Sequence, residues 1–248
     1  MHDNPKVDIR VTDGRLFLRL HPGAFDVVIS EPSNPWQAGN ADLFTVEFFR
    51  LGARALRPGG IFCQWVHLYG LTPANVRTLV RTFAEVFPHA YVISTIKDTD
   101  ILLLGGEGAL TLDLARAWGS MAAAKSVADD MADPRVGVRS LFDLLARFRM
   151  GPRDLREFAG AGPLHTDDLP LIAYRAPFDL YLETRGANMR LLALHANGIA
   201  PYLEDLTGIP MPPRAFFEML AKSYDQFLPY GREAVVCQEW AAQATEIP

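Results

Sequence analysis

Residues 25–30, Phe-Asp-Val-Val-Ile-Ser, constrain the fold more than any other stretch of the chain. They are β-branched and nearly all apolar, as expected for a strand that is buried on both faces. Turn-forming residues occupy 31–40, and from Phe44 to Ala55 apolar residues recur at helical spacing. A buried strand followed by a loop and a helix is the repeating unit of an α/β sheet.

The same alternation continues on both sides of this unit. Apolar patterns predict further strands at 7–11, 61–68, 91–96 and 101–104, and helices at 15–20 and after Thr72-Pro73, an N-cap followed by proline. Residues 97–100 are expected to form a hairpin turn between the last two strands. Residues 7–104 therefore predict an α/β fold with a largely parallel sheet, covered by helices on both faces and ending in an antiparallel edge.

Beyond residue 108 the pattern becomes helical. Helices are predicted at 110–121, 138–149, 188–194 and 213–227. Phe216, Phe217, Leu220 and Phe227 are expected to be core residues of the last helix. We therefore divide the chain into an α/β region, 1–108, and a mainly helical extension, 109–248.

Composition narrows the class of protein. The chain has 24 basic and 29 acidic residues and a net charge of −5, which argues against nucleic acid as a partner. No apolar run approaches the length of a membrane helix, and the N-terminus does not resemble a secretory signal. Cys63 and Cys237 are too few for a disulfide framework, so a reducing, cytoplasmic setting is expected. Cys63 is expected to be a core residue.

Two polar clusters follow predicted strands: Thr12-Asp13-Gly14, and the stretch from Glu31 to Gln37. In an open α/β sheet, ligands bind beyond the carboxyl ends of the strands, so both clusters could face one crevice. Turn formation alone would also account for their Gly, Pro and Asn residues. The residues by themselves leave both interpretations open.

Several ordered motifs carry a family resemblance: Asp13-Gly14-Arg15, the run 25–36, Leu43-Phe44-Thr45 and the run 58–65. Together they resemble the second half of a spermidine synthase catalytic domain, in particular the spermidine-synthase-like domains fused to membrane segments in some bacteria. The resemblance covers about residues 5–105, and the stretch 166–170 is similar too. It implies a Rossmann-like fold of the class I methyltransferase type.

Enzymes of that family transfer an aminopropyl group from decarboxylated S-adenosylmethionine, a donor substrate and not a resident cofactor, to an amine such as putrescine. By resemblance, Asp13 and Gly14 would contact the adenine of the donor. Glu31 would stand in the place of the catalytic carboxylate that takes a proton from the attacking amine. The amine side would be formed by Ser33, Asn34, Gln64, Trp65 and Tyr69, with no metal.

Two features depart from the family pattern. The usual loop has aspartate at the positions of Glu31 and Asn34, so putrescine recognition is expected to differ, with another amine or no amine in its place. The glycine-rich donor loop of the family would lie upstream of residue 5. We therefore expect a truncated chain, a fragment with an upstream partner, or a degenerate copy, and a central strand left as an unpaired sheet edge.

Other interpretations remain open. A methyltransferase using S-adenosylmethionine could employ the same scaffold, and a catalytically inactive assembly module is a third possibility. Expected partners are a small amine and a nucleoside donor, with a homodimer or an upstream membrane segment as further candidates. His165, Asp167 and Asp168 lack a second His or Cys at ligand spacing, so a capping or loop-tethering role is expected and not a metal site. His67 is expected to be packed or solvent-facing in preference to catalytic.

Overall fold

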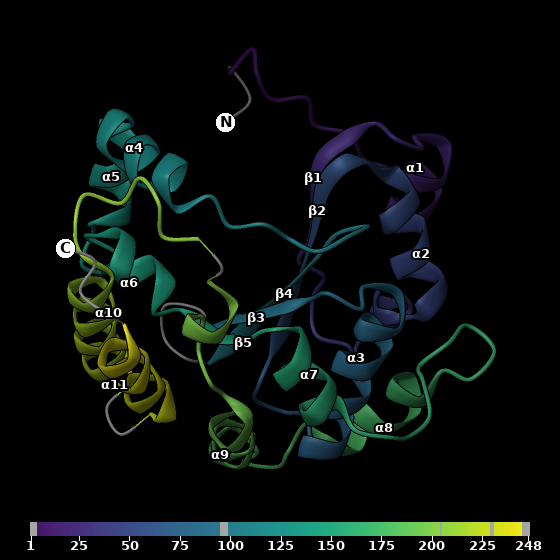
Figure 1. Ribbon diagram of the computed structural model, residues 1–248. Coiled ribbons are helices and arrows are strands. Elements are labelled where there is room, and N and C mark those ends of the chain that lie inside the picture. The colour runs from purple at the N-terminus through teal and green to yellow at the C-terminus, as the bar shows by residue number, and fades with distance from the viewer. Residues whose placement is uncertain (1–3, 95–98, 204, 229–230, 245–248) are drawn as a thin grey trace.

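A five-stranded sheet lies at the centre of the computed structural model, which describes residues 4–94, 99–203, 205–228 and 231–244 (Figure 1). Its strands are β1 (Phe25–Ser30), β2 (Leu56–His67), β3 (Tyr91–Ser94), β4 (Asp100–Gly105) and β5 (Phe148–Met150). Their order across the sheet is β1-β2-β4-β3-β5. The predicted α/β class is therefore confirmed.

The direction of the strands differs in part from the prediction. β1 pairs with β2 in parallel, whereas β4 is antiparallel to both of its neighbours, β2 and β3. β1, β2 and β3 thus point the same way, but β4 lies between β2 and β3 instead of at the sheet edge. The prediction that this hairpin forms an antiparallel edge is therefore wrong. The crossover from β2 to β3 leaves a gap one strand wide between them, and the returning strand β4 fills it. The edge is β5, paired with β3.

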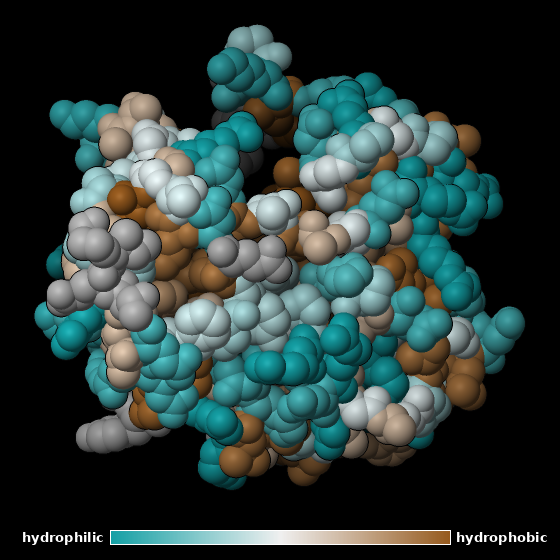
Figure 2. All heavy atoms as spheres, viewed as in Figure 1, coloured by the Kyte–Doolittle hydropathy of each residue, from teal (hydrophilic) through white to brown (hydrophobic). Residues whose placement is uncertain are grey.

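Helices cover one face of the sheet around β1 and β2. α2 (Val46–Ala55) and α3 (Pro73–Val86) lie on that face, where Phe49, Phe62 and Phe83 stack edge to face or tilted. On the opposite face, Val27 and Ile29 of β1 are 54% and 71% exposed. Figure 2 shows apolar side chains at the wall of a hollow near the N-terminal segment. The prediction of helices on both faces is thus wrong for β1, because α1 (Gly14–Leu20) packs on α2 instead.

The segment 7–11 is not a strand, contrary to its apolar alternation. Val7, Ile9 and Val11 are 43%, 54% and 101% exposed. A strand forms only where a neighbour accepts its backbone hydrogen bonds, and no described strand pairs with this segment or with the outer side of β1. The expected unpaired edge is therefore present at β1.

Two apolar clusters form the interior of the described chain. The first joins the sheet and α2 and α3 to α7 (Pro152–Ala159), α8 (Leu171–Asp179) and α9 (Arg185–His195). The second joins α4 (Leu114–Ala123), α6 (Leu141–Leu145), α10 (Pro213–Phe227) and α11 (Arg232–Gln243), with α5 (Lys125–Met131) beside α4. In Figure 1 these helices gather at the β3–β5 end of the sheet. The division at residue 108 stays a prediction.

The helix predictions beyond residue 108 meet mixed outcomes. The helix at 213–227 is confirmed as α10, and Phe216, Phe217 and Leu220 are buried in it. The helix expected at 138–149 is wrong in its second half, because residues 148–150 pair with β3 as β5. No helix in the described part of the chain is long and apolar enough to cross a bilayer.

Buried polar side chains of α8 and α9 hold the loop between β2 and α3. Thr72 occupies the N-cap position of α3, followed by Pro73 as predicted, but its side chain does not cap the helix. Instead the carboxylate of Asp179 accepts hydrogen bonds from Thr72 N at 2.7 Å, Thr72 Oγ1 at 2.9 Å and Asn75 Nδ2 at 2.6 Å. Asn188 Nδ2 donates to the carbonyls of Leu68 and Leu71. These contacts fix the path of residues 68–72.

Replacing Asp179 by alanine should lower the free energy of unfolding by about 3 kcal/mol, because three donors lose one buried acceptor. Urea unfolding followed by circular dichroism measures this loss. The matched control is Asp205→Ala, which removes an exposed carboxylate that accepts from Thr207 N, and it should cost less than about 1 kcal/mol. Equal losses in the two variants would contradict this account of the loop.

Candidate functional site

The carboxyl ends of β1 and β2 lie side by side. Ser30 is the register partner of Gln64, so the chain leaves β1 at Glu31 next to Trp65. The loop 31–40 starts there and returns to η1 (Asn40–Phe44) ahead of α2. This is the sheet edge at which open α/β folds bind ligands.

Four rings form an aromatic cluster beside this edge: Trp36, Trp65, His67 and Tyr69. The ring of His67 has its centroid 4.9 Å from that of Trp36, 5.2 Å from that of Trp65 and 4.9 Å from that of Tyr69. Gly70, with φ +58°, lies under Trp36, and a Cβ there would come within 2.8 Å of the indole. Glycine at this position therefore permits the approach of Trp36, which joins the loop 31–40 to β2.

His67 is fully buried at the centre of the aromatic cluster. Neither of its ring nitrogens has a hydrogen-bond partner among the described residues. Burial lowers the pKa of His67 to about 4, because the charged imidazolium would lose its hydration. The ring is thus neutral at physiological pH, and of the two placements expected for this histidine, packed or solvent-facing, the structure shows the packed one.

Two carboxylates flank the cluster. Glu31 is exposed at the end of β1, and Asp100 begins β4 as the register partner of His67. The pKa of Asp100 is raised, mainly because burial disfavours its charged form. Hydrogen bonds from Thr99, whose Oγ1 donates at 3.1 Å, and from Trp65 lower this pKa in part, and the negative charge of Glu31 raises it. Burial, together with the charge of Glu31, also raises the pKa of Cys63 to about 11, so this buried thiol is not a nucleophile.

Gly14 and Glu31 line one cavity of about 320 Å³. Apolar side chains form most of its wall: Phe17, Leu18, Val28, Ile29, Leu43 and Phe48. Asp13 is not among its lining residues. Its carboxylate accepts a hydrogen bond from Leu16 N at 2.7 Å and so caps α1. The structure thus brings Gly14, but not the carboxylate of Asp13, to the cavity that Glu31 borders.

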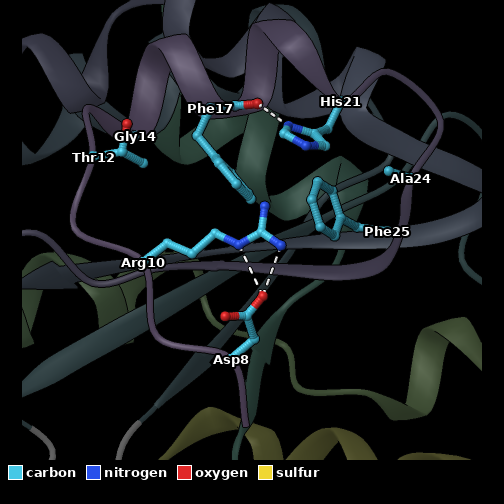
Figure 3. Close-up of a pocket in the computed structure, with 8 residues that line it drawn as sticks. All are labelled: Asp8, Arg10, Thr12, Gly14, Phe17, His21, Ala24 and Phe25. Atoms are coloured by element: carbon cyan, nitrogen blue, oxygen red, sulfur yellow. Dashed lines mark hydrogen bonds and ion pairs between the residues drawn. The ribbon is translucent and has the colours of Figure 1, made fainter.

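A second cavity, of about 560 Å³, shares Gly14 and Phe17 with the first. Figure 3 shows Arg10 extending beneath the rings of Phe17 and Phe25, with Asp8 bonded to its guanidinium at 2.8 Å. The guanidinium carbon is 5.8 Å from the centre of the Phe17 ring. The Arg10–Asp8 pair is exposed, so it contributes little stability.

The remaining predicted amine residues are not all on one face. Gln64 and Trp65 are neighbours within β2, so their side chains point to opposite faces of the sheet. Gln64 is fully buried and donates from Nε2 to Trp65 O at 3.0 Å, whereas Trp65 is partly exposed. Ser33 is exposed, and the carbonyl of Asn34 accepts from Gln37 N and Asn40 Nδ2, which closes a tight turn. The structure therefore groups Trp65 and Tyr69, but not Gln64, around the aromatic cluster.

His165 ties its loop to the helical layer. Its ring is buried, with Nε2 2.9 Å from Ala41 O, and its backbone N donates to Thr82 Oγ1. Asp167 makes an ion pair with Arg15 at the start of α1. The predicted tether is confirmed. No group of three potential metal ligands occurs in residues that the structure describes.

Sequence reasoning missed Asp100 and Trp36 as members of the site. The sequence predicts a turn over residues 97–100, of which 97 and 98 lie outside the described residues. Asp100 instead begins a strand whose register places it opposite His67. The sequence indicates Trp36 only as part of the loop motif that ends the run 25–36. The order Asp-Ile-Leu-Leu-Leu, with an acid immediately ahead of an apolar strand, is the one signal that could have indicated Asp100.

Comparison with known proteins finds similarity in the N-terminal part of the chain. Residues 1–99 match the family model of the spermine/spermidine synthase domain. Spermidine synthase from Schizosaccharomyces pombe is 38% identical over 100 residues, which are 38% of this chain and 32% of that protein. Spermidine synthase from Dictyostelium discoideum is 39% identical over 92 residues, which are 35% of this chain and 30% of that protein.

A solved structure is also similar: that of a probable spermidine synthase from Corynebacterium glutamicum, at 22% identity and a TM-score of 0.44, over 66% of this chain and 55% of that one. The N-terminal part of the chain, residues 1–99, is thus similar to the spermine/spermidine synthase domain. The matched stretch is about a third of the length of these curated relatives.

His67 should make stability depend on pH. The unfolded chain takes up a proton at this residue below about pH 6.5, but the folded chain does so only near pH 4. Stability should therefore fall as the pH is lowered through this window, by about 2 kcal/mol from this residue between pH 7 and pH 5. Urea unfolding at the two pH values measures the loss.

In His67→Phe this part of the pH dependence should disappear. The matched control is His89→Phe, which alters an exposed histidine and should retain the wild-type dependence. A His67→Phe variant that loses as much stability as wild type between pH 7 and pH 5 would show that His67 is not held neutral in the folded protein.

Proposed function

We propose that this chain carries the amine-binding part of the active site of an aminopropyltransferase, with Glu31 as the base that takes the proton from the amine. The observation that carries the proposal is the position of Glu31. Its side chain borders both the apolar cavity that Gly14 lines and the edge of the sheet where the aromatic cluster lies. One carboxylate is thus within reach of a nucleoside in the cavity and of an amine beside the rings.

Aminopropyl transfer requires a base between the nucleoside cavity and the aromatic cluster, where Glu31 lies. An alkylammonium has no lone pair, so it must lose a proton before its nitrogen attacks the carbon beside the donor sulfonium. A carbon–nitrogen bond forms, the carbon–sulfur bond breaks with its electron pair on sulfur, and methylthioadenosine leaves. Glu31 would take the proton, and its negative charge would also favour binding of the cationic amine.

The nucleoside of decarboxylated S-adenosylmethionine would bind in the cavity between Gly14 and Glu31. Its apolar wall suits a purine and a thioether, and the absence of a side chain on Gly14 leaves room for the nucleoside against α1. Asp13 does not line this cavity and would act indirectly, because its carboxylate caps α1 and so holds Gly14 at the cavity wall. The family resemblance and the 38% and 39% identities to spermidine synthases support this assignment.

Replacing Glu31 by glutamine should reduce release of methylthioadenosine from decarboxylated S-adenosylmethionine and 1,4-diaminobutane by about 100-fold or more, because general-base catalysis is lost. Chromatographic measurement of methylthioadenosine tests this. The matched control, Glu107→Gln, alters an exposed acid near the end of β4 and should leave release unchanged.

Undiminished release from Glu31→Gln would rule out this carboxylate as the base. Release of S-adenosylhomocysteine from S-adenosylmethionine, in place of methylthioadenosine, would favour the methyltransferase alternative. If the wild-type chain released neither product, the inactive-module alternative would gain and the proposed function would fail.

A further inference from the structure

We propose that residues 165–167, here called the strap, position the nucleoside cavity, and that the ion pair between Asp167 and Arg15 sets the affinity of this cavity for its ligand. The inference rests on the proposed function, because the ligand is the nucleoside of the donor. It gives a role to a segment outside residues 1–99, the stretch that is similar to the spermine/spermidine synthase domain. Asp167 and Arg15 act through Gly14, so they are positioning residues.

The N-terminal end of α1 depends on few contacts. None of the seven residues of this helix is buried, so burial in the core does not fix its position. The cap by Asp13 orders the first turn of the helix itself. The C-terminal end is tied to α2, because Gly23 N donates to the carbonyl of Arg54. At the N-terminal end, where Gly14 lines the cavity, the hydrogen bonds to other parts of the described chain are those of Arg15.

Arg15 makes a two-pronged contact with the strap. Its Nη1 donates to Asp167 Oδ1 at 3.0 Å, and its Nη2 donates to Asp167 Oδ2. Nη1 also donates to the carbonyl of Asp42 at 3.0 Å. Paired hydrogen bonds between a guanidinium and a carboxylate fix the angle between the partners as well as their distance. They also lower the pKa of Asp167, because they favour the charged carboxylate.

The strap also holds η1 and the start of α2. His165 Nε2 lies 2.9 Å from Ala41 O, and the carbonyl of His165 accepts from Val46 N at 3.0 Å. Asp167 N donates to the carboxylate of Glu47 at 3.0 Å. One short segment is therefore bonded to three elements that are separate in the sequence: α1, η1 and α2.

These three elements form walls of the nucleoside cavity. Partners of the strap are immediate neighbours of three lining residues: Gly14 next to Arg15, Leu43 next to Asp42, and Phe48 next to Glu47. Because the strap joins the three walls, it fixes the separation of α1 from η1 and α2. A strap that no longer holds Arg15 lets the N-terminal end of α1 move outward, and a bound nucleoside then loses apolar contact.

The effect falls on binding of the nucleoside and not on proton transfer. Glu31 lies at the end of β1, which is held by its pairing with β2 and makes no hydrogen bond with the strap among the described residues. Loss of the ion pair should therefore raise the KM for the donor and leave kcat near the wild-type value. The side chains of Arg15 and Asp167 are 25% and 41% exposed, so the effect is modest in size.

Isothermal titration calorimetry with methylthioadenosine tests the proposal. Asp167→Asn should weaken binding about fivefold, the factor expected from a partly exposed ion pair of good geometry. With decarboxylated S-adenosylmethionine and 1,4-diaminobutane, the KM for the donor should rise by about the same factor while kcat is unchanged. Asp168→Asn is the matched control and should bind like wild type, because Asp168 is the adjacent exposed acid and has no ion pair within the described chain.

A double-mutant cycle separates positioning from a general loss of stability. Arg15→Gln should weaken binding by at least as much as Asp167→Asn, and the double variant should be no weaker than Arg15→Gln alone, because one shared contact is lost. Additive losses, or unchanged binding by Asp167→Asn, would overturn the role of the strap and leave the Glu31 mechanism intact. A wild-type chain that neither binds methylthioadenosine nor releases it from the donor would overturn the proposed function and this inference with it.

Discussion

The pairing of β2 with both β1 and β4 is the constraint on which the rest of the site depends. β2 is twelve residues long, with a parallel neighbour on one side and an antiparallel neighbour on the other. The parallel register sets Glu31 beside Trp65, and the antiparallel register sets Asp100 opposite His67. A slip of one residue in either pairing would turn one of these acids to the opposite face.

The position of β2 depends in turn on buried contacts behind it. Phe62 packs against Phe48, Phe49 and Phe83, and a Cβ at Gly52 would collide with the Phe62 ring. Beyond the end of β2, Asp179 and Asn188 hold the loop that carries Tyr69. One side of the sheet is thus rigidly packed, while the side that bears Val27, Ile29 and the aromatic cluster is more open. The packed side thus holds the strands in place for a ligand site on the open side.

Local patterns in the sequence predicted the parts of the fold that local forces decide. Residues 213–227 form the expected helix because their apolar spacing is sufficient to define a buried face. Residues 25–30 form the expected strand, but the prediction that it is buried on both faces is wrong, because Val27 and Ile29 are exposed. The segment 7–11 has an equally good alternation of apolar and polar residues, but it is not a strand. A strand also needs a neighbouring strand to pair with, and local residue spacing does not reveal whether one is present. The insertion of β4 between β2 and β3 is likewise a property of long-range pairing, and so was not predicted.

The same distinction holds for the site. Glu31 and Gly14 could be named from motifs, and the structure brings both to one cavity. The family resemblance assigns both Gln64 and Trp65 to the amine side, yet adjacent residues of a strand have side chains on opposite faces. Asp100 could not be assigned without the β2–β4 register, since it is 69 residues from Glu31 in the sequence.

A crystal structure of the chain soaked with methylthioadenosine and 1,4-diaminobutane would test the central claim most directly. The account predicts the nucleoside in the cavity lined by Gly14 and one ammonium group within hydrogen-bond distance of the Glu31 carboxylate. A nucleoside bound only in the cavity beneath Arg10, or a diamine away from Glu31, would contradict it.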